Sequence, residues 1–222
     1  MKRMVALFFA FMMMASCSMA MADEGTKTDG DFLFNNLAWG THKDDVFKAI
    51  TEMCSGIEIE AEEEEIEFGN LLQVICTYKN KQSGESICKV GEMEVKQIVA
   101  EYLCEDGKYD YALYAISCQS EDRSSFENIL EKYQASLGSL YDMRDIAVDN
   151  EHQVISGQEI TWKNSDETQT VSIVLSRIKT DAFGYRTGNS KPKFTDHLQI
   201  WFTNVEMEQY LQQKTEYYGK SR

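Results

Sequence analysis

Two segments of this chain carry apolar side chains at the three- and four-residue spacing of an amphipathic helix, and several strand-like runs follow each of them. These helices are predicted over residues 43–54 and 126–138, and a third over residues 205–215 near the C-terminus. This order predicts the α+β class, in which helices pack on one face of antiparallel sheet. We expect two helix-plus-antiparallel-sheet units in tandem with a C-terminal helix. The units span residues 32–120 and 121–222 and share one core, because no linker rich in Pro, Gly or Ser divides them.

The polar residues at the helix ends fit capping better than catalysis. Thr41 stands at the expected N-cap of the first helix, and Asp44 lies three residues later, as in a capping box. Ser124 and Glu127 form the regular version of this motif before the second helix, and Gly138 supplies its stop. Each of these residues therefore has a structural task, and none is assigned a catalytic one.

Seven strand-like runs lie between the predicted helices. The turn at Asp106-Gly107 predicts a hairpin, and a long polar connection to about Ser156 precedes the runs of the second half. Trp201 alternates with apolar neighbours in the last run, so its face is either a binding surface or the plain outer face of a sheet. The runs are residues 56–61, 70–78, 94–104, 110–118, 158–163, 170–179 and 197–204.

Residues 1–22 have the features of an export signal. Lys2 and Arg3 precede an apolar stretch that is too short to span a bilayer, and a small-x-small motif predicts cleavage before Asp23. Localisation in the periplasm follows as the first expectation. Residues 23–31 are polar and contain glycine, so we expect a flexible lead-in there.

A lipobox-like segment that ends at Cys17 gives an alternative to a soluble exported chain. In that case Cys17 is acylated and becomes the N-terminus, and the protein is anchored to the membrane only through the lipid. Intact mass of the exported protein distinguishes the two forms.

The chain is acidic, with a formal net charge of −15 that becomes −17 once the leader with its two basic residues is removed. This balance argues against a nucleic-acid partner, because phosphate binding needs clustered Lys and Arg. It also steers a basic partner toward the protein. The expected partner is another envelope protein or a small ligand.

Five further cysteines lie in the first half of the mature chain, without a C-x-x-C motif, and disulfides are the default in an exported protein. Cys76 and Cys88 flank a polar link between strand-like runs and form the first predicted pair. Cys104 and Cys118 flank the predicted hairpin and form the second. Cys54 is then free, buried or bound to another chain, and the acidic run behind it disfavours a reactive thiolate.

Two surface features could bind a partner. The first is an acidic run that is either an electrostatic patch for a basic protein or a solvated strand edge. It is centred on Glu62, Glu63, Glu64 and Glu65. The second is a long loop after the sixth run that mixes aromatic and basic residues, as interaction hot spots do. Its candidate residues are Phe183, Tyr185, Arg186, Lys191 and Lys193, with Trp201 on the strand that follows.

The start of the fold resembles that of a group of exported bacterial proteins and lipoproteins without an assigned activity. Residues Leu37, Trp39, Gly40, Thr41 and Val46 and the helix over residues 126–138 carry the resemblance. The tandem plan also looks like that of secreted β-lactamase inhibitor proteins and of small outer-membrane assembly lipoproteins. Both are binding modules, so the resemblance implies a fold and a compartment, while architecture alone does not transfer a function.

The sequence contains no nucleophile elbow, zinc-protease motif, phosphate loop or dinucleotide fingerprint. We therefore expect no catalytic, cofactor or metal residues. The first hypothesis is an exported, non-enzymatic binding module that uses a sheet face and the loop described above. The alternatives are an envelope hydrolase whose carboxylates cannot be singled out, and an inhibitor or immunity-type protein against a basic target.

Overall fold

The computed structural model describes residues 29–54, 56–150, 153–179 and 194–219. The described part contains three α-helices, one large antiparallel sheet and one small two-stranded sheet, so the protein is a mostly β member of the α+β class. The helices are α1 (Lys43–Met53), α2 (Phe126–Leu137) and α3 (Val205–Gly219). The strands are β1 (Ile59–Phe68), β2 (Leu71–Asn80), β3 (Cys88–Val90), β4 (Met93–Val95), β5 (Gln97–Glu105), β6 (Tyr109–Ser120), β7 (Asp142–Asn150), β8 (Gln153–Lys163), β9 (Gln169–Lys179) and β10 (Phe194–Asn204).

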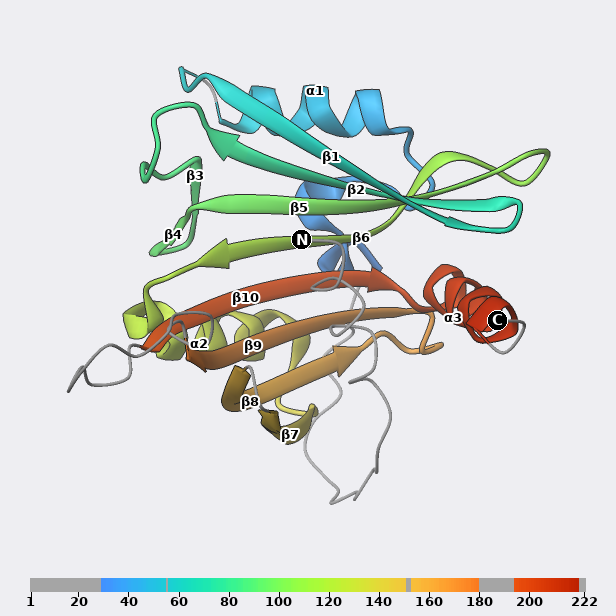
Figure 1. Cartoon of the computed structure of the whole chain (residues 1–222). Coiled ribbons are helices and arrows are strands. Elements are labelled where there is room, and N and C mark those ends of the chain that lie inside the picture. Colours follow the sequence, from blue (N-terminus) through green and yellow to red (C-terminus); the bar gives the residue numbers. More distant parts are fainter. Residues whose placement is uncertain (1–28, 55, 151–152, 180–193, 220–222) are drawn as a thin grey trace, which may run out of the picture.

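The large sheet has eight strands in the order β1-β2-β5-β6-β10-β9-β8-β7, and every neighbouring pair is antiparallel. Within each half the strands of the large sheet pair in chain order, with the separate β3–β4 ribbon inserted between β2 and β5, and β6 pairs with β10 in the centre (Figure 1). The two edges are β1 and β7. A single sheet therefore runs through both halves of the described chain.

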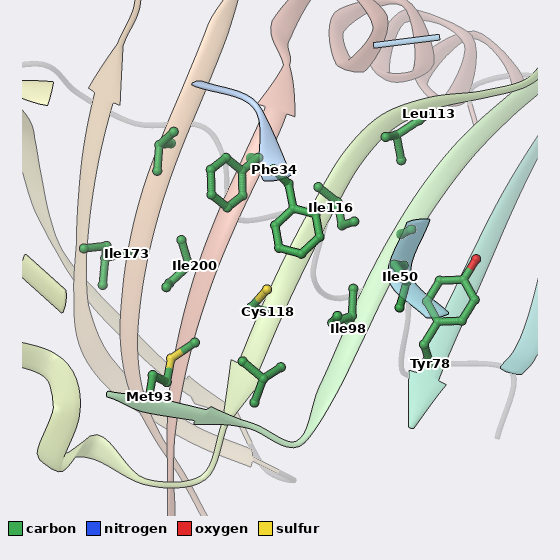
Figure 2. Packing of buried hydrophobic residues seen from close by; sticks show 14 of the residues in the cluster. Phe34, Ile50, Tyr78, Met93, Ile98, Leu113, Ile116, Cys118, Ile173 and Ile200 are labelled. Carbon is green, nitrogen blue, oxygen red and sulfur yellow. The ribbon is translucent and has the colours of Figure 1, made fainter. Parts of the chain in front are cut away.

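Helices α1 and α2 cover the same face of this sheet (Figure 1). Val46 and Ile50 of α1 and Ile129 of α2 belong to one buried cluster that includes alternate residues of strands from β2 to β10. Figure 2 shows the labelled side chains of Ile98 and Ile200 pointing into this cluster from β5 and β10. We call this side of the sheet the α1–α2 face.

Helix α3 packs on the opposite face, at one end of the sheet. Met207 and Leu211 form a second, smaller buried cluster with residues of β2, β5 and β6, among them Leu71, Leu103 and Tyr114. No helix in the described residues is long and apolar enough to cross a lipid bilayer.

Both predicted N-caps are wrong by one or more residues. His42 caps α1, because its ring Nδ1 accepts a hydrogen bond from the Asp44 N–H at 3.3 Å, while the Thr41 hydroxyl bonds to the Ala38 carbonyl. Before α2 the carboxylate of Asp122 accepts from the N–H and hydroxyl of Ser124, so a 3-10 turn precedes the helix.

The observed bounds of the strands and turns agree with some of the other predictions and differ from others. Strands form in all seven predicted runs, and the Asp106-Gly107 hairpin is confirmed. The first strand begins three residues later than predicted, at Ile59, and extends to Phe68, and the third run is divided between β4 and β5. The polar connection to Ser156 is wrong, because β7 and the start of β8 form there. Phe47, one of the apolar residues whose spacing predicts α1, is exposed. The lead-in is shorter than expected, since a 3-10 turn spans Asp29–Phe32.

Candidate functional site

The centre of the sheet face opposite α1 and α2 carries a row of polar and aromatic side chains. Strand register places Trp201 of β10 between Ser117 of β6 and Ser172 of β9, and Ser172 lies opposite Thr161 of β8. The neighbouring row joins three glutamines of β5, β6 and β10. We call these residues together the polar patch: Gln97, Gln119, Gln199, Trp201, Ser117, Ser172 and Thr161.

Side-chain hydrogen bonds run along the polar patch. Gln97 Nε2 donates to Gln119 Oε1 at 2.6 Å, and Gln119 Nε2 donates to the Ser117 hydroxyl at 3.3 Å. The indole N–H of Trp201 donates to Gln199 Oε1 at 3.2 Å. Because these bonds hold the side chains in fixed rotamers, little side-chain entropy remains to be lost when another molecule binds.

The polar patch is only partly exposed. Ser117 and Gln199 are buried, whereas Gln97, Gln119 and Trp201 are half-buried. An aromatic ring with a polar N–H, set among amides, is typical of protein-binding surfaces, where Trp contributes much of the affinity. None of the seven side chains of the polar patch is a nucleophile paired with a general base.

A buried carboxylate lies beside the polar patch, under the start of α3. Glu101 of β5 accepts hydrogen bonds from the Tyr114 hydroxyl and from Gln73 Nε2, the latter at 3.0 Å. Burial raises the pKa of Glu101, and the bonds from Tyr114 and Gln73 oppose that rise. Burial beside this carboxylate also raises the pKa of Tyr114, so both groups keep their protons more firmly than in water.

Glu208 of α3 faces the same region. Burial raises its pKa to about 7, and the negative charges of Glu101 and Glu159 add to the rise. Glu159 is itself held in an ion pair with Arg144 across β7 and β8. Glu208 is therefore a carboxyl group that gains or loses its proton near neutral pH at the edge of the polar patch.

Replacing Glu208 with Gln should flatten the pH dependence of stability. The pKa is raised in the folded protein, so protonated Glu208 favours folding below about pH 4.5, and this contribution is lost as the pH rises to about 7. Urea denaturation at pH 8 should show the variant more stable than the native protein by about 2 kcal/mol, and at pH 4.5 nearly equal. Glu206→Gln, at an exposed position of the same helix turn, is the control. An equal gain at both pH values would contradict the assignment.

The acidic run does not form one surface. It lies in edge strand β1, so successive glutamates point to opposite faces. Glu62 pairs with Lys79 at 2.8 Å and Glu63 pairs with Lys43 at 3.0 Å, whereas Glu64 and Glu65 have no ion pair within the described residues. Two of the four charges are thus partly neutralised inside the molecule.

Trp201 is the one residue of the loop-associated candidates that the structure describes. Phe183, Tyr185, Arg186, Lys191 and Lys193, like Cys17 and the export segment, lie outside the described residues.

The structure also brings together groups that sequence reasoning missed. Glu101 and Glu208 come from elements far apart in the chain, so no local motif joins them. The sequence contained one signal for this site. Glu101 is the single charged residue in the apolar run from Ile98 to Leu103, and strand alternation places its side chain on the sheet face away from the main core.

The cysteines in the described part are all free thiols. Register opposes the pair Cys104–Cys118, because Cys118 lies opposite Ile98 and Cys104 is six residues further along β5, a separation of about 20 Å. Cys76 lies 3.9 Å from a carboxylate oxygen of Glu63, and no disulfide joins it to Cys88 in this structure.

No cluster of three or more His, Cys, Asp or Glu in the described ranges could hold a metal ion. Comparison of the chain with known proteins found no matching family model, no matching curated protein and no matching solved structure.

Proposed function

We propose that this chain is an exported, non-enzymatic module that binds a polypeptide partner through the polar patch of its sheet. The observation that supports the proposal is the patch itself. Its amides and Trp201 lie on the sheet face that α1 and α2 leave uncovered, and hydrogen bonds fix their orientation. A surface held in this way loses little entropy on binding and offers donors and acceptors for a partner backbone.

The charge distribution favours a partner with a basic segment. Glu208 adds a partial negative charge beside the polar patch at neutral pH, and β1 carries exposed glutamates at the sheet edge, among them Glu64 and Glu65. The chain as a whole carries a net charge of −15. A basic segment would be steered toward this face, because few positive charges there would repel it. The inhibitor or immunity-type alternative is one form of the same proposal.

The tandem arrangement belongs to this proposal. We interpret α1 with β1, β2, β5 and β6 as one unit, and α2 with β7 to β10 as the second. In support, each unit is one helix followed by a four-stranded antiparallel run, and the last strands of the two runs pair in the centre. This plan and the resemblance of the opening segment to exported bacterial proteins agree with a periplasmic or lipid-anchored binding module.

A hydrolase remains the second candidate, for one reason. The pKa of Glu208 lies at about 7, where a carboxyl group can act as a general acid or base. Against this role, Glu101 is occupied by Tyr114 and Gln73, and Glu159 by Arg144. The candidate would be favoured if Glu208→Gln abolished a hydrolytic activity of the native protein without changing its fold.

A photo-crosslinking amino acid placed at two positions tests the proposal. Val174 of β9 lies on the same sheet face as the polar patch, beside Gln199. Its side chain makes no hydrogen bond, so its replacement removes none. Glu131 is an exposed residue of α2 on the other side of the sheet. Irradiation in the producing cells should give an adduct of one discrete mass from position 174 and none from position 131. Equal adducts from both positions, or none from position 174, would contradict the proposal.

A further inference from the structure

A lysine, a glutamate and an asparagine meet where α3 packs on the end of the large sheet. Lys214 lies in the C-terminal half of α3, Glu105 ends β5, and Asn70 lies in the turn between β1 and β2. Figure 1 shows this turn at the same end of the sheet as α3. Segments that are far apart in the sequence thus bring an amine, a carboxylate and a primary amide together. We call these three residues the amide triad.

The carboxylate of Glu105 bonds to both of the other groups through one oxygen atom. Its Oε1 accepts a hydrogen bond from Asn70 Nδ2 at 2.5 Å and another from Lys214 Nζ at 3.0 Å. Its Oε2 accepts from the Tyr210 hydroxyl. Lys214 Nζ also lies 3.5 Å from Asn70 Oδ1. The amine and the amide nitrogen therefore share one hydrogen-bond acceptor, across which a proton can pass from one to the other.

The amine of Lys214 is close to the carbonyl carbon of Asn70. A C=O bond is about 1.2 Å long, so Nζ lies within about 5 Å of this carbon. Rotation of the flexible lysine side chain brings the two atoms to the separation of about 3–3.5 Å from which such a reaction starts. Met207 and Leu211 hold α3 against the sheet in the second buried cluster, so this approach needs no movement of the backbone.

Aromatic rings line one side of the amide triad. The rings of Tyr109 and Tyr210 meet edge to face at 5.6 Å, and both pack with Phe68 against the second buried cluster. Lys214 Nζ lies 5.2 Å from the centre of the Tyr210 ring. The side chain of Glu105 is only 6% exposed. Water therefore has little access to the carboxylate that contacts both nitrogen atoms.

We propose that Lys214 and Asn70 condense to an isopeptide bond that ties α3 to the β1–β2 turn, with Glu105 as the group that moves the proton. The bond would fasten the last helix of the described chain covalently to its first hairpin. The inference does not depend on the proposed binding function, because the reaction needs no partner.

The reaction balances without a second reagent. The free amine of Lys214 attacks the amide carbon of Asn70, and a new C–N bond forms. Oε1 of Glu105 takes one proton from the attacking nitrogen and passes it to Nδ2 of the amide. The bond between the carbon and Nδ2 then breaks, and ammonia leaves. One amine and one primary amide become one secondary amide and one ammonia, and no group is oxidised or reduced.

The charge state of Lys214 sets the rate of this reaction. The hydrogen bond to Glu105 raises the pKa of Lys214, and the hydrogen bond from Tyr210 lowers the pKa of Glu105, so the resting pair is ammonium and carboxylate. Lys108 adds a like charge on this side, with its Nζ 3.1 Å from the centre of the Tyr210 ring. Only the fraction of Lys214 that has lost its proton can attack. The rate should therefore rise about tenfold per pH unit while the pH stays below this pKa.

Intact mass of the folded protein after incubation at about pH 9 tests the proposal. The native protein should lie below its sequence mass by one ammonia. Lys214→Arg should keep its full mass, because a guanidinium preserves the ion pair with Glu105 but does not attack an amide. Glu105→Gln should slow the loss at least about tenfold. Lys79, which pairs with Glu62 at 2.8 Å, gives the control, and Lys79→Arg should react like the native protein. A native protein that keeps its full mass would overturn the proposal.

Peptide mapping distinguishes the isopeptide bond from other losses of ammonia. Trypsin does not cleave after a lysine whose amine is acylated, so residues 49–79 should appear joined to residues 194–220. A succinimide at Asn70 gives the same change of mass, but it leaves Lys214 open to cleavage and yields residues 194–214 as a separate peptide. That separate peptide in the lighter protein, or an Asn70 that is only converted to aspartate, would overturn the proposal even if a variant fails to fold.

Discussion

Replacing Trp162 with Ala should lower the free energy of unfolding by about 4 kcal/mol. The side chain of Trp162 in β8 is fully buried. Its ring lies 5.4 Å from the ring of Tyr141 and 6.2 Å from that of Tyr133, and its indole N–H donates to the Gly138 carbonyl at 2.8 Å. The substitution removes a large apolar volume, opens a cavity and leaves the last carbonyl group after α2 without its donor.

Trp39→Ala is the matched control for this experiment. Trp39 is only partly buried, and its indole N–H has no hydrogen-bond partner among the residues that the structure describes. Its removal should cost no more than about 2 kcal/mol. Urea denaturation followed by circular dichroism measures both variants without relying on tryptophan fluorescence. A cost for Trp162→Ala no larger than that of the control would show that the contact between α2 and β8 is not the one described.

Gly157→Ala should cost about 3 kcal/mol, because β8 approaches β9 too closely for any side chain there. A Cβ atom on Gly157 would lie 2.0 Å from the carbonyl oxygen of Leu175 and 2.8 Å from the Cα of Ser176. Both contacts are with backbone, so no side chain can rotate away, and relief requires the two strands to move apart. The sheet must then give up part of its pairing at this point.

The neighbouring exposed residue gives the comparison for Gly157. Ser156→Ala alters the same strand without a close backbone contact and should change stability by less than about 0.5 kcal/mol. Similar effects of the two substitutions would contradict the close approach of β8 to β9. Denaturant midpoints of the two variants and the native protein, measured side by side, decide between the outcomes.

Local pattern was enough to predict the helices and most strands. The apolar spacing that ends at Gly138 marked α2, and the glycine has a φ of +85°, a backbone conformation that suits a helix stop. Strand β7 escaped prediction because its sequence, DMRDIAVDN, is mostly polar, as an edge strand can be when packing on one side is weak. The β3–β4 ribbon escaped because three residues are too few to show alternation.

Pairing between the halves could not be predicted. Strands β6 and β10 are neighbours although about 80 residues separate Ser117 from Trp201, and such a pairing is decided by tertiary packing rather than by a turn. For the same reason, the sequence identified Trp201 as a candidate on a polar strand face but not the amides and serines around it. Glu101 and Glu208 meet only because α3 folds back over β5 and β6.

Crosslinking from position 174 in chains that also carry Trp201→Ala or Phe47→Ala tests the binding proposal most directly. Both substitutions remove a partly or fully exposed aromatic ring, the first within the polar patch and the second on α1 at the other side of the sheet. The proposal predicts that Trp201→Ala reduces the adduct at least tenfold, while Phe47→Ala leaves it unchanged. An adduct that survives Trp201→Ala at full yield, or that is lost equally in both chains, would contradict a partner bound through the polar patch.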